Sequence, residues 1–185
     1  GTLSQHPAYV RFFEQARVKD VAAFLRFVTN RRDEVSFKRL VMLLPGIGGG
    51  VADKLWKEWL KTGLATNAEP PPKWSDLLLE FKAPKKAAKH WQQLCYTLDE
   101  MTPDGHFAKP SEMIFSVLEG VYDDYLKANF DNYDNRRSDI EQLSQYGGNF
   151  EAIEEFLAQL SLMGSVDGEP TGEKSEIDDE KVTLS

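Results

Sequence analysis

Apolar residues recur along most of the chain at the three- and four-residue spacing of amphipathic α-helices. The pattern is clearest from Glu14 to Thr29. Further helical patterns cover 35–44, 51–60, 76–81, 84–101, 111–126, 132–146 and a last segment around 153–160. The sequence therefore predicts an all-α, multi-helix domain.

Residues that start or end helices in other proteins stand between these patterns. The predicted starts are Asp33-Glu34, Ser75, Ser111 and Asn149, and the predicted ends or turns are Gly63, Asn67–Pro72, Thr102–Gly105 and Gly147-Gly148. The first ten residues show no periodicity, and the aromatic pair Phe12-Phe13 introduces the first helix.

A glycine-rich corner joins the second and third helical patterns. One helix is expected to bury Val35, Leu40, Val41 and Leu44, and the other Val51, Leu55, Trp59 and Leu60. Pro45 is expected to end the first helix, and the glycines that follow allow a tight turn with positive φ. Such a helix-hairpin-helix-like corner can offer main-chain N–H groups to a phosphate at the start of the second helix. The alternative is an ordinary corner of an all-α protein.

The candidate nucleic-acid-binding residues come from this corner and the basic residues near it. They are Gly46, Ile47, Gly48, Gly49, Lys54, Lys38 and Arg39.

Positive and negative charges are unevenly divided between the two parts of the chain. The net charge of −8 combines about +5 over residues 1–110 with about −13 over residues 111–185. Basic residues cluster at 31–39 and at 82–89, whereas acids crowd into 173–180. The net charge of the whole chain is therefore a poor guide to what the first half binds.

Three segments are expected along the chain. Residues 1–163 form the helical domain, residues 164–180 a flexible acidic linker, and residues 181–185 the start of a β-strand. A lone strand has no partner in an all-α chain, so we expect this sequence to be a piece of a longer protein.

Motifs of catalysis, metal binding and membrane insertion are missing from the sequence. No Gly-Lys pair of a phosphate-binding loop occurs, the three histidines and Cys95 lack metal-ligand spacing, and no apolar run approaches the ~18 residues of a membrane span. Asp99-Glu100 imitates a Mg-ATP motif but lies in a helical pattern. We expect no catalytic residue and no cofactor or metal site here, and we expect Cys95 and the four tryptophans to lie in the core. The single cysteine fits a reducing, cytoplasmic location.

The order of several segments resembles the 2B subdomain of UvrD/Rep-type superfamily-1 DNA helicases. The similar segments are Arg11–Glu14, Val18–Arg26, Asn30–Glu34, Phe37–Leu40, Pro45–Gly48, Ile153–Leu162 and Val182–Ser185. Three positions depart from the usual pattern of the family, namely Arg17, Pro45 and the pair Gly50-Val51. The last departure removes hydroxyl groups, so contacts to phosphate at this corner would rely on main-chain N–H groups.

By this resemblance the parent protein would be an ATP-driven 3′-to-5′ DNA helicase with a role in DNA unwinding or repair. The chain would be a regulatory module that contacts double-stranded DNA and the motor domains of the same protein, with 181–185 entering the second motor domain (2A). ATP and Mg would bind in the motor domains, so the chain alone would be inactive. The second hypothesis is a protein–protein module whose acidic half docks on the motor domains or on a DNA-repair protein.

Overall fold

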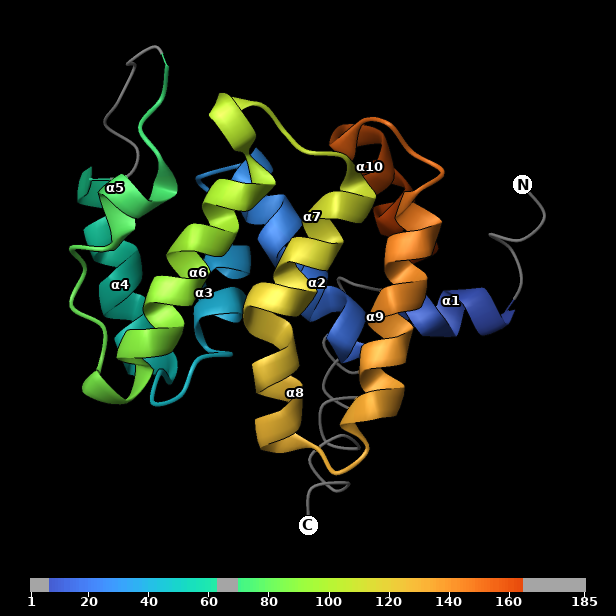
Figure 1. Ribbon diagram of the computed structural model, residues 1–185, viewed down its shortest axis with the longest axis horizontal. Helices are drawn as coiled ribbons and strands as arrows, with labels where there is room; N and C mark the ends of the chain where they lie inside the picture. Colours follow the sequence, from blue (N-terminus) through green and yellow to red (C-terminus); the bar gives the residue numbers. More distant parts are fainter. Residues whose placement is uncertain (1–6, 63–69, 165–185) are drawn as a thin grey trace.

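The computed structural model describes residues 7–62 and 70–164, and within these ranges the chain is helical and contains no strand (Figure 1). The all-α prediction is confirmed. The elements in chain order are α1 (Pro7–Glu14), α2 (Ala16–Thr29), α3 (Glu34–Val41), α4 (Gly49–Thr62), α5 (Trp74–Leu78), η2 (Lys85–Ala87), α6 (Ala88–Met101), η3 (Pro103–Gly105), α7 (Pro110–Val117), η4 (Leu118–Tyr122), α8 (Asp123–Asn129), α9 (Tyr133–Gly147) and α10 (Ile153–Met163).

Helix α2 is the central element. In Figure 1 it lies behind α6 and α7, with α4 and α5 on one side and α9 and α10 on the other. It packs against α1, α3, α6, α7, α9 and α10. Apolar residues occur on almost every face of this helix, and ten of its fourteen residues are buried. A helix that is apolar all round is stable in water only when other helices cover it.

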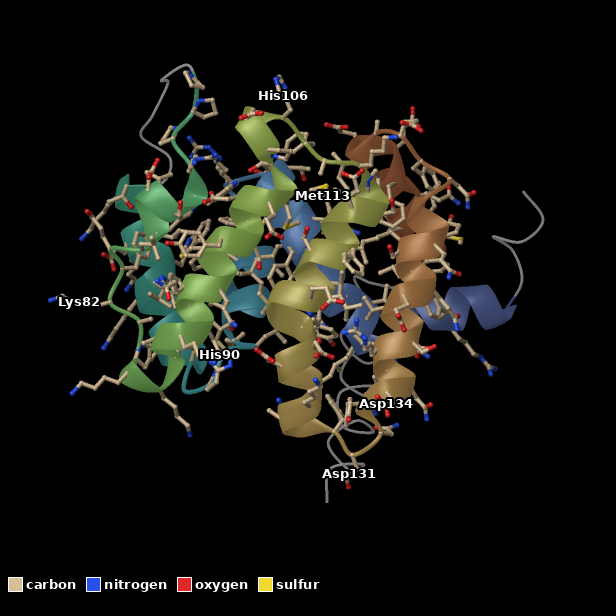
Figure 2. The ribbon with its side chains drawn as sticks, in the orientation of Figure 1. Lys82, His90, His106, Met113, Asp131 and Asp134 are labelled. Atoms are coloured by element: carbon tan, nitrogen blue, oxygen red, sulfur yellow. The ribbon has the colours of Figure 1, made fainter. Side chains whose placement is uncertain are left out.

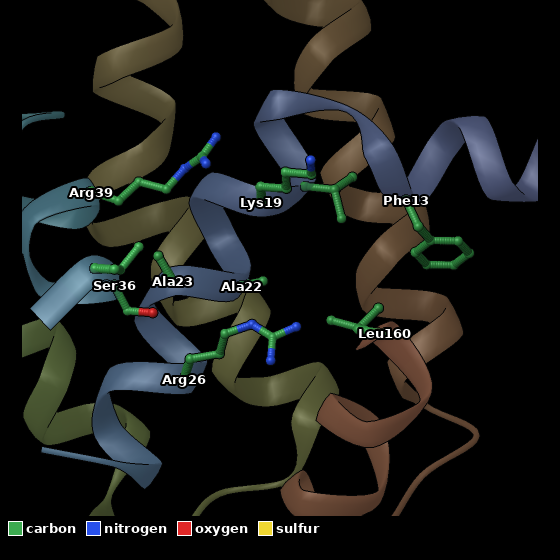
Figure 3. Close-up of a pocket in the computed structure, with 10 residues that line it drawn as sticks. Phe13, Lys19, Ala22, Ala23, Arg26, Ser36, Arg39 and Leu160 are labelled. Carbon is green, nitrogen blue, oxygen red and sulfur yellow. The ribbon is translucent and has the colours of Figure 1, made fainter. Parts of the chain in front are cut away.

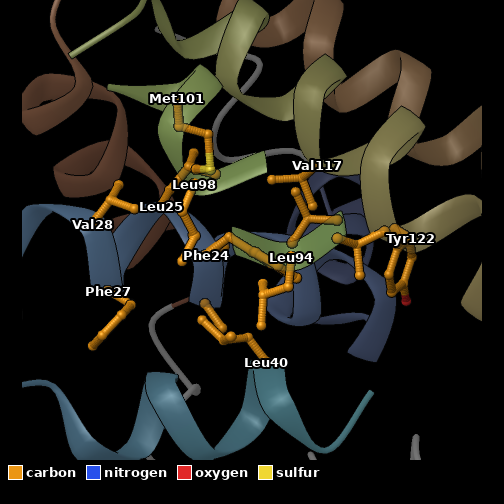
Figure 4. Close-up of a cluster of buried hydrophobic side chains, with 14 of the residues drawn as sticks. Phe24, Leu25, Phe27, Val28, Leu40, Leu94, Leu98, Met101, Val117 and Tyr122 are labelled. Carbon is orange, nitrogen blue, oxygen red and sulfur yellow. The ribbon is translucent and has the colours of Figure 1, made fainter. Parts of the chain in front are cut away.

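The core around α2 is built from residues far apart in the sequence (Figure 4). Phe24 and Leu25 are fully buried, and Leu94 and Leu98 of α6 lie against them. Val117 of α7 extends the same cluster. Each such side chain contributes roughly 1.5–3 kcal/mol when it is removed from water. The predicted apolar faces of these helices are therefore the ones that form the core.

A buried carboxylate ties three elements together. Asp20 of α2 is only 7% exposed. It accepts hydrogen bonds from Arg39 Nε at 2.8 Å and from the Tyr122 hydroxyl at 2.8 Å. A buried charge without such partners costs several kcal/mol, so this contact fixes α3 and η4 relative to α2.

The four tryptophans are buried, as predicted. Trp59 and Trp74 stack with ring centroids 5.7 Å apart, and Phe27 packs on both rings. The indole N–H of Trp59 donates to the Arg31 carbonyl at 2.8 Å, and that of Trp91 donates to the Leu78 carbonyl at 2.8 Å. These contacts leave the rings committed to the core rather than available for stacking on bases.

Two of the predicted helix starts are wrong. Helix α5 begins at Trp74, where the Asp76 carboxylate accepts from the Lys73 N–H, while the N–H of Ser75 donates to the Asp99 carboxylate at 3.2 Å. Helix α10 begins at Ile153 after an extended Ala152, because the turn that ends α9 takes up Asn149. By contrast, Asp33 caps α3 as predicted, accepting from the Ser36 N–H at 3.0 Å.

Other differences concern the first residues and two apolar side chains. A helix, α1, already starts at Pro7, and an extended Gln15 separates it from α2. Val35 is 79% exposed and Leu60 is 46% exposed, so neither lies on the buried face predicted for its helix. Each stands at the edge of an apolar stripe, where sequence spacing cannot tell which neighbour covers it.

Some predictions lie outside the described residues. These are Gly63, most of the turn at 67–72, the acidic linker beyond Gly164 and the strand at 181–185. None of the described helices is long and apolar enough to cross a membrane.

The helix predicted over 111–126 contains one π-helical turn, η4, between α7 and α8. Gly120 in this turn lies so close to α6 that a Cβ atom there would clash with Thr97 Oγ1. We expect Gly120→Ala to lower the free energy of unfolding by about 1–3 kcal/mol, since Ala overpacks this contact. Urea unfolding followed by circular dichroism measures the change.

Gly50→Ala is the matched control, because a Cβ at Gly50 would meet no atom within 4 Å. Its free energy of unfolding should stay the same or rise, as expected for Ala in place of Gly in a helix. Adding Thr97→Ala to Gly120→Ala should restore stability in part. An unchanged stability of the Gly120→Ala variant would show that η4 and α6 do not pack this closely.

Cys95 is fully buried in α6, as predicted. Burial, with a smaller contribution from the Asp99 carboxylate, raises the pKa of its thiol to about 12. The thiol should therefore resist an aromatic disulfide reagent at pH 8 and react fully in denaturant. Because the folded state holds this proton more tightly than the unfolded chain, its stabilising contribution is complete below pH ~8.5 and is lost as the pH rises toward 12. Rapid reaction of the native protein at pH 8 would contradict the buried position.

Candidate nucleic-acid interface

The corner between α3 and α4 is a tight turn around one glycine and one buried isoleucine. Gly46 has a φ of +78°, a conformation that favours glycine, and Gly48, Gly49 and Gly50 do not share it. Ile47 is only 5% exposed, and its N–H donates to the Leu44 carbonyl at 3.3 Å. Helix α3 already ends at Val41, before Pro45, so the proline follows the helix end rather than causing it directly.

The start of α4 is open to solvent. Gly48, Gly49 and Gly50 are exposed, and a Cβ atom at any of the three would meet nothing within 4 Å. The first bond of this helix runs from the Ala52 N–H to the Gly48 carbonyl at 2.9 Å. The N–H groups of Gly49, Gly50 and Val51 donate to no other residue in the described ranges. An anion can therefore approach three main-chain donors at the positive end of a fourteen-residue helix.

The basic residues predicted beside the corner differ in their surroundings. Lys38 bridges Glu34 and Asp53, with its ammonium 2.7 Å from Asp53 Oδ1. Hydrogen bonds to these two carboxylates raise the pKa of Lys38, and the bond to Asp53 has the larger effect. Lys38 in turn lowers the pKa of Asp53. This ion pair offsets the charge of Asp53, in the second turn of α4, which would otherwise repel a phosphate at the helix start. Lys38 therefore supports the site without adding net charge to it.

Arg39 and Lys54 have opposite environments. Arg39 bonds the buried Asp20 and, through Nη2, the carbonyl of Ala16 at 3.3 Å, so its main role is to hold α3 on α2. Lys54 is exposed on α4 and makes no ion pair with any residue that the structure describes. Of the three predicted basic residues, Lys54 alone presents an unneutralised charge next to the glycines.

A second group of cations lies against the corner and was not among the predicted site residues. A Cβ at Gly46 would be 3.4 Å from Lys86 Cβ and 3.8 Å from Pro84 Cβ. The segment that enters α6, with its lysines at 82–89, therefore touches the glycine turn. Figure 2 shows Lys82 extending away from the body of the protein on this side. The run of lysines is visible in the sequence, but nothing in the spacing indicates that it packs on Gly46.

Two hollows lie elsewhere on the surface, and neither offers a set of catalytic residues. One, of about 170 Å³, lies between α2, α3 and α10 and is lined mainly by Phe13, Ala22, Ala23 and Leu160, with Arg26 over it (Figure 3). The other, of about 600 Å³, contains Arg31, whose guanidinium lies 4.1 Å from the centre of the Trp74 ring. Among the described residues, no three His, Cys, Asp or Glu side chains come together in a way that could hold a metal ion.

The chain matches a family of known proteins. The model of the UvrD-like helicase C-terminal domain family matches residues 8–176. No curated protein and no solved structure matches the chain.

The position of Arg39 leads to a test of its role. Replacing it by Gln removes the Arg39 guanidinium from the buried Asp20 carboxylate and leaves the hydrogen bond from the Tyr122 hydroxyl, so we expect Arg39→Gln to lower the free energy of unfolding by about 2–3 kcal/mol. Lys54→Gln is the control and should leave stability within about 0.5 kcal/mol of wild type. Thermal unfolding measures the stability of both variants. Equal stability of the two would show that Arg39 does not stabilise the fold.

Proposed function

Because the chain belongs to the UvrD-like helicase C-terminal domain family, we propose that it is the 2B subdomain of an ATP-dependent DNA helicase. We propose further that it contacts the backbone of double-stranded DNA through the corner between α3 and α4. The family membership makes the chain a region of a UvrD-like helicase. The observation that supports DNA contact is the open start of α4, where exposed glycines carry unbonded main-chain N–H groups.

This contact would be independent of DNA sequence. Main-chain N–H groups and a lysine ammonium recognise phosphate oxygens, which are the same at every base pair. Ile47 anchors the turn in the core, so the donors are held in place before the DNA arrives. Gly48 and Gly49 leave the approach to these donors free of side chains, and Gly46 provides the turn that precedes them.

ATP hydrolysis is assigned in this proposal to motor domains outside the chain. They would bind ATP and Mg, and this chain would act on them by changing how the protein holds the duplex. The chain alone would then bind duplex DNA weakly and hydrolyse no ATP.

A protein–protein role is the second candidate, and the acidic second half of the sequence favours it. Residues 111–185 carry about −13, and in Figure 2 Asp131, between α8 and α9, and Asp134, in the first turn of α9, lie at the same end of the molecule. Such a surface would suit a basic face on a motor domain or on a DNA-repair protein. Chemical-shift mapping separates the two roles, since duplex-induced changes within 36–58 support DNA contact and their absence supports the protein–protein role.

Gly48→Leu tests the corner directly. A Cβ at Gly48 meets nothing within 4 Å, so the fold should tolerate the substitution while the side chain blocks the donors of α4. For the wild-type chain and a labelled duplex, fluorescence anisotropy should give a dissociation constant of ~10⁻⁴ M or weaker, with a log–log salt slope of about −2 to −3. Gly48→Leu should weaken this binding several-fold.

Ala128→Leu, which introduces the same side chain at an exposed position of α8, is the matched control and should bind as wild type does. Strong preference for one DNA sequence, or equal binding by Gly48→Leu, would contradict the proposal.

A further inference from the structure

We propose that the segment 82–89, with Lys82, Lys85, Lys86 and Lys89, is a second contact surface for the phosphates of the same duplex. We name it the lysine segment. This inference rests on the proposed DNA contact of the corner and adds a part of the chain that is remote from it in sequence. Packing of Pro84 and Lys86 on Gly46 makes the lysine segment and the corner one continuous surface.

The charge of the lysine segment is not neutralised by the protein. Its four lysines are exposed, and none of them makes an ion pair with a residue in the described part of the chain. Glu80 is the only acid between Asp76 and Asp99. Several cations elsewhere in the fold are engaged in ion pairs: Lys127 pairs with Asp123, and Arg137 with Glu119 and Asp123. Unpaired positive charge is therefore gathered beside the glycine turn.

The backbone of the lysine segment is held firmly, so the positions from which its lysine side chains extend are fixed. Phe81 stacks on Trp91 with ring centroids 6.2 Å apart. Ala87 is fully buried, and its N–H donates to the Pro84 carbonyl at 2.9 Å. With Phe81, Ala87 and Trp91 directed into the core, the lysines between them are left on the outside. The backbone of the lysine segment therefore needs no rearrangement to meet a ligand.

The chemistry of this surface fits the DNA backbone. Two or three neutralised phosphates require as many available cations, and Lys38 and Arg39 are already paired with carboxylates. Lys54 supplies one cation, and the lysine segment supplies the others. Lysine ammonium groups act as point charges, so they add affinity without reading bases.

The test compares two double variants of the chain on the same labelled duplex. Lys85→Gln/Lys86→Gln removes two charges of the lysine segment, and Gln keeps the Cβ, Cγ and Cδ atoms that pack near Gly46. Lys109→Gln/Lys127→Gln removes two charges from other faces. Circular dichroism establishes that both are folded. Binding is measured by anisotropy over a range of salt concentrations.

We expect Lys85→Gln/Lys86→Gln to bind about tenfold more weakly at ~50 mM salt, with a salt slope shallower by about 1.8. Lys109→Gln/Lys127→Gln should match wild type. As an independent measurement, the duplex should protect Lys85 and Lys86 of the wild-type chain from acetylation and leave Lys109 and Lys127 reactive.

The opposite results are distinguishable. If Gly48→Leu weakens binding while Lys85→Gln/Lys86→Gln binds as wild type does, DNA contact by the corner is supported and DNA contact by the lysine segment is excluded. Equal weakening by both double variants would show a response to net charge alone and would overturn the inference. If wild type binds no duplex at low salt, both the proposed function and this inference fail. Protection of Lys85 and Lys86 by a glutamate-rich peptide, but not by duplex, would assign the surface to an acidic protein and overturn it.

Discussion

The burial of one carboxylate in an otherwise apolar helix is the constraint on which this arrangement depends. Asp20 lies in α2, the helix on which six others pack, and it must be paired there because an isolated buried charge is costly. Arg39 and Tyr122 provide the partners. The first fixes α3 on α2 and the second fixes η4, so the pairing of one side chain orients two elements. The corner at the end of α3 inherits this orientation.

The corner itself combines a buried anchor with an open backbone. Ile47 is enclosed in the core, while the glycines next to it are exposed and unobstructed. The ion pair between Lys38 and Asp53 links α3 to α4 and offsets the charge of an acid in the second turn of α4. These contacts keep the donors of α4 unbonded and accessible, which is the property that an anion-binding helix start requires.

Much of the fold could be predicted because helical periodicity reports which residues avoid water. The pattern identified the long helices and the buried tryptophans, and the local chemistry of Asp33 gave a correct helix start. The errors in helix starts and in buried faces came from contacts between distant parts of the chain, which residue spacing does not reveal. The N–H of Ser75 donates to the Asp99 carboxylate, and α5 begins at Trp74 rather than after a cap at Ser75. Val35 lies at the edge of its stripe, and no neighbour covers it.

The sequence by itself determined the helical class, the position of the glycine corner and the family to which the chain belongs, because each of these depends on residue types at short spacing. Only the tertiary structure decided which cations remain available at the corner. Lys38 and Arg39 lie next to it in sequence but are paired, and the lysine segment is remote in sequence but packs on Gly46. Charge availability depends on distances between side chains of different helices, and those distances arise only when the helices pack around α2.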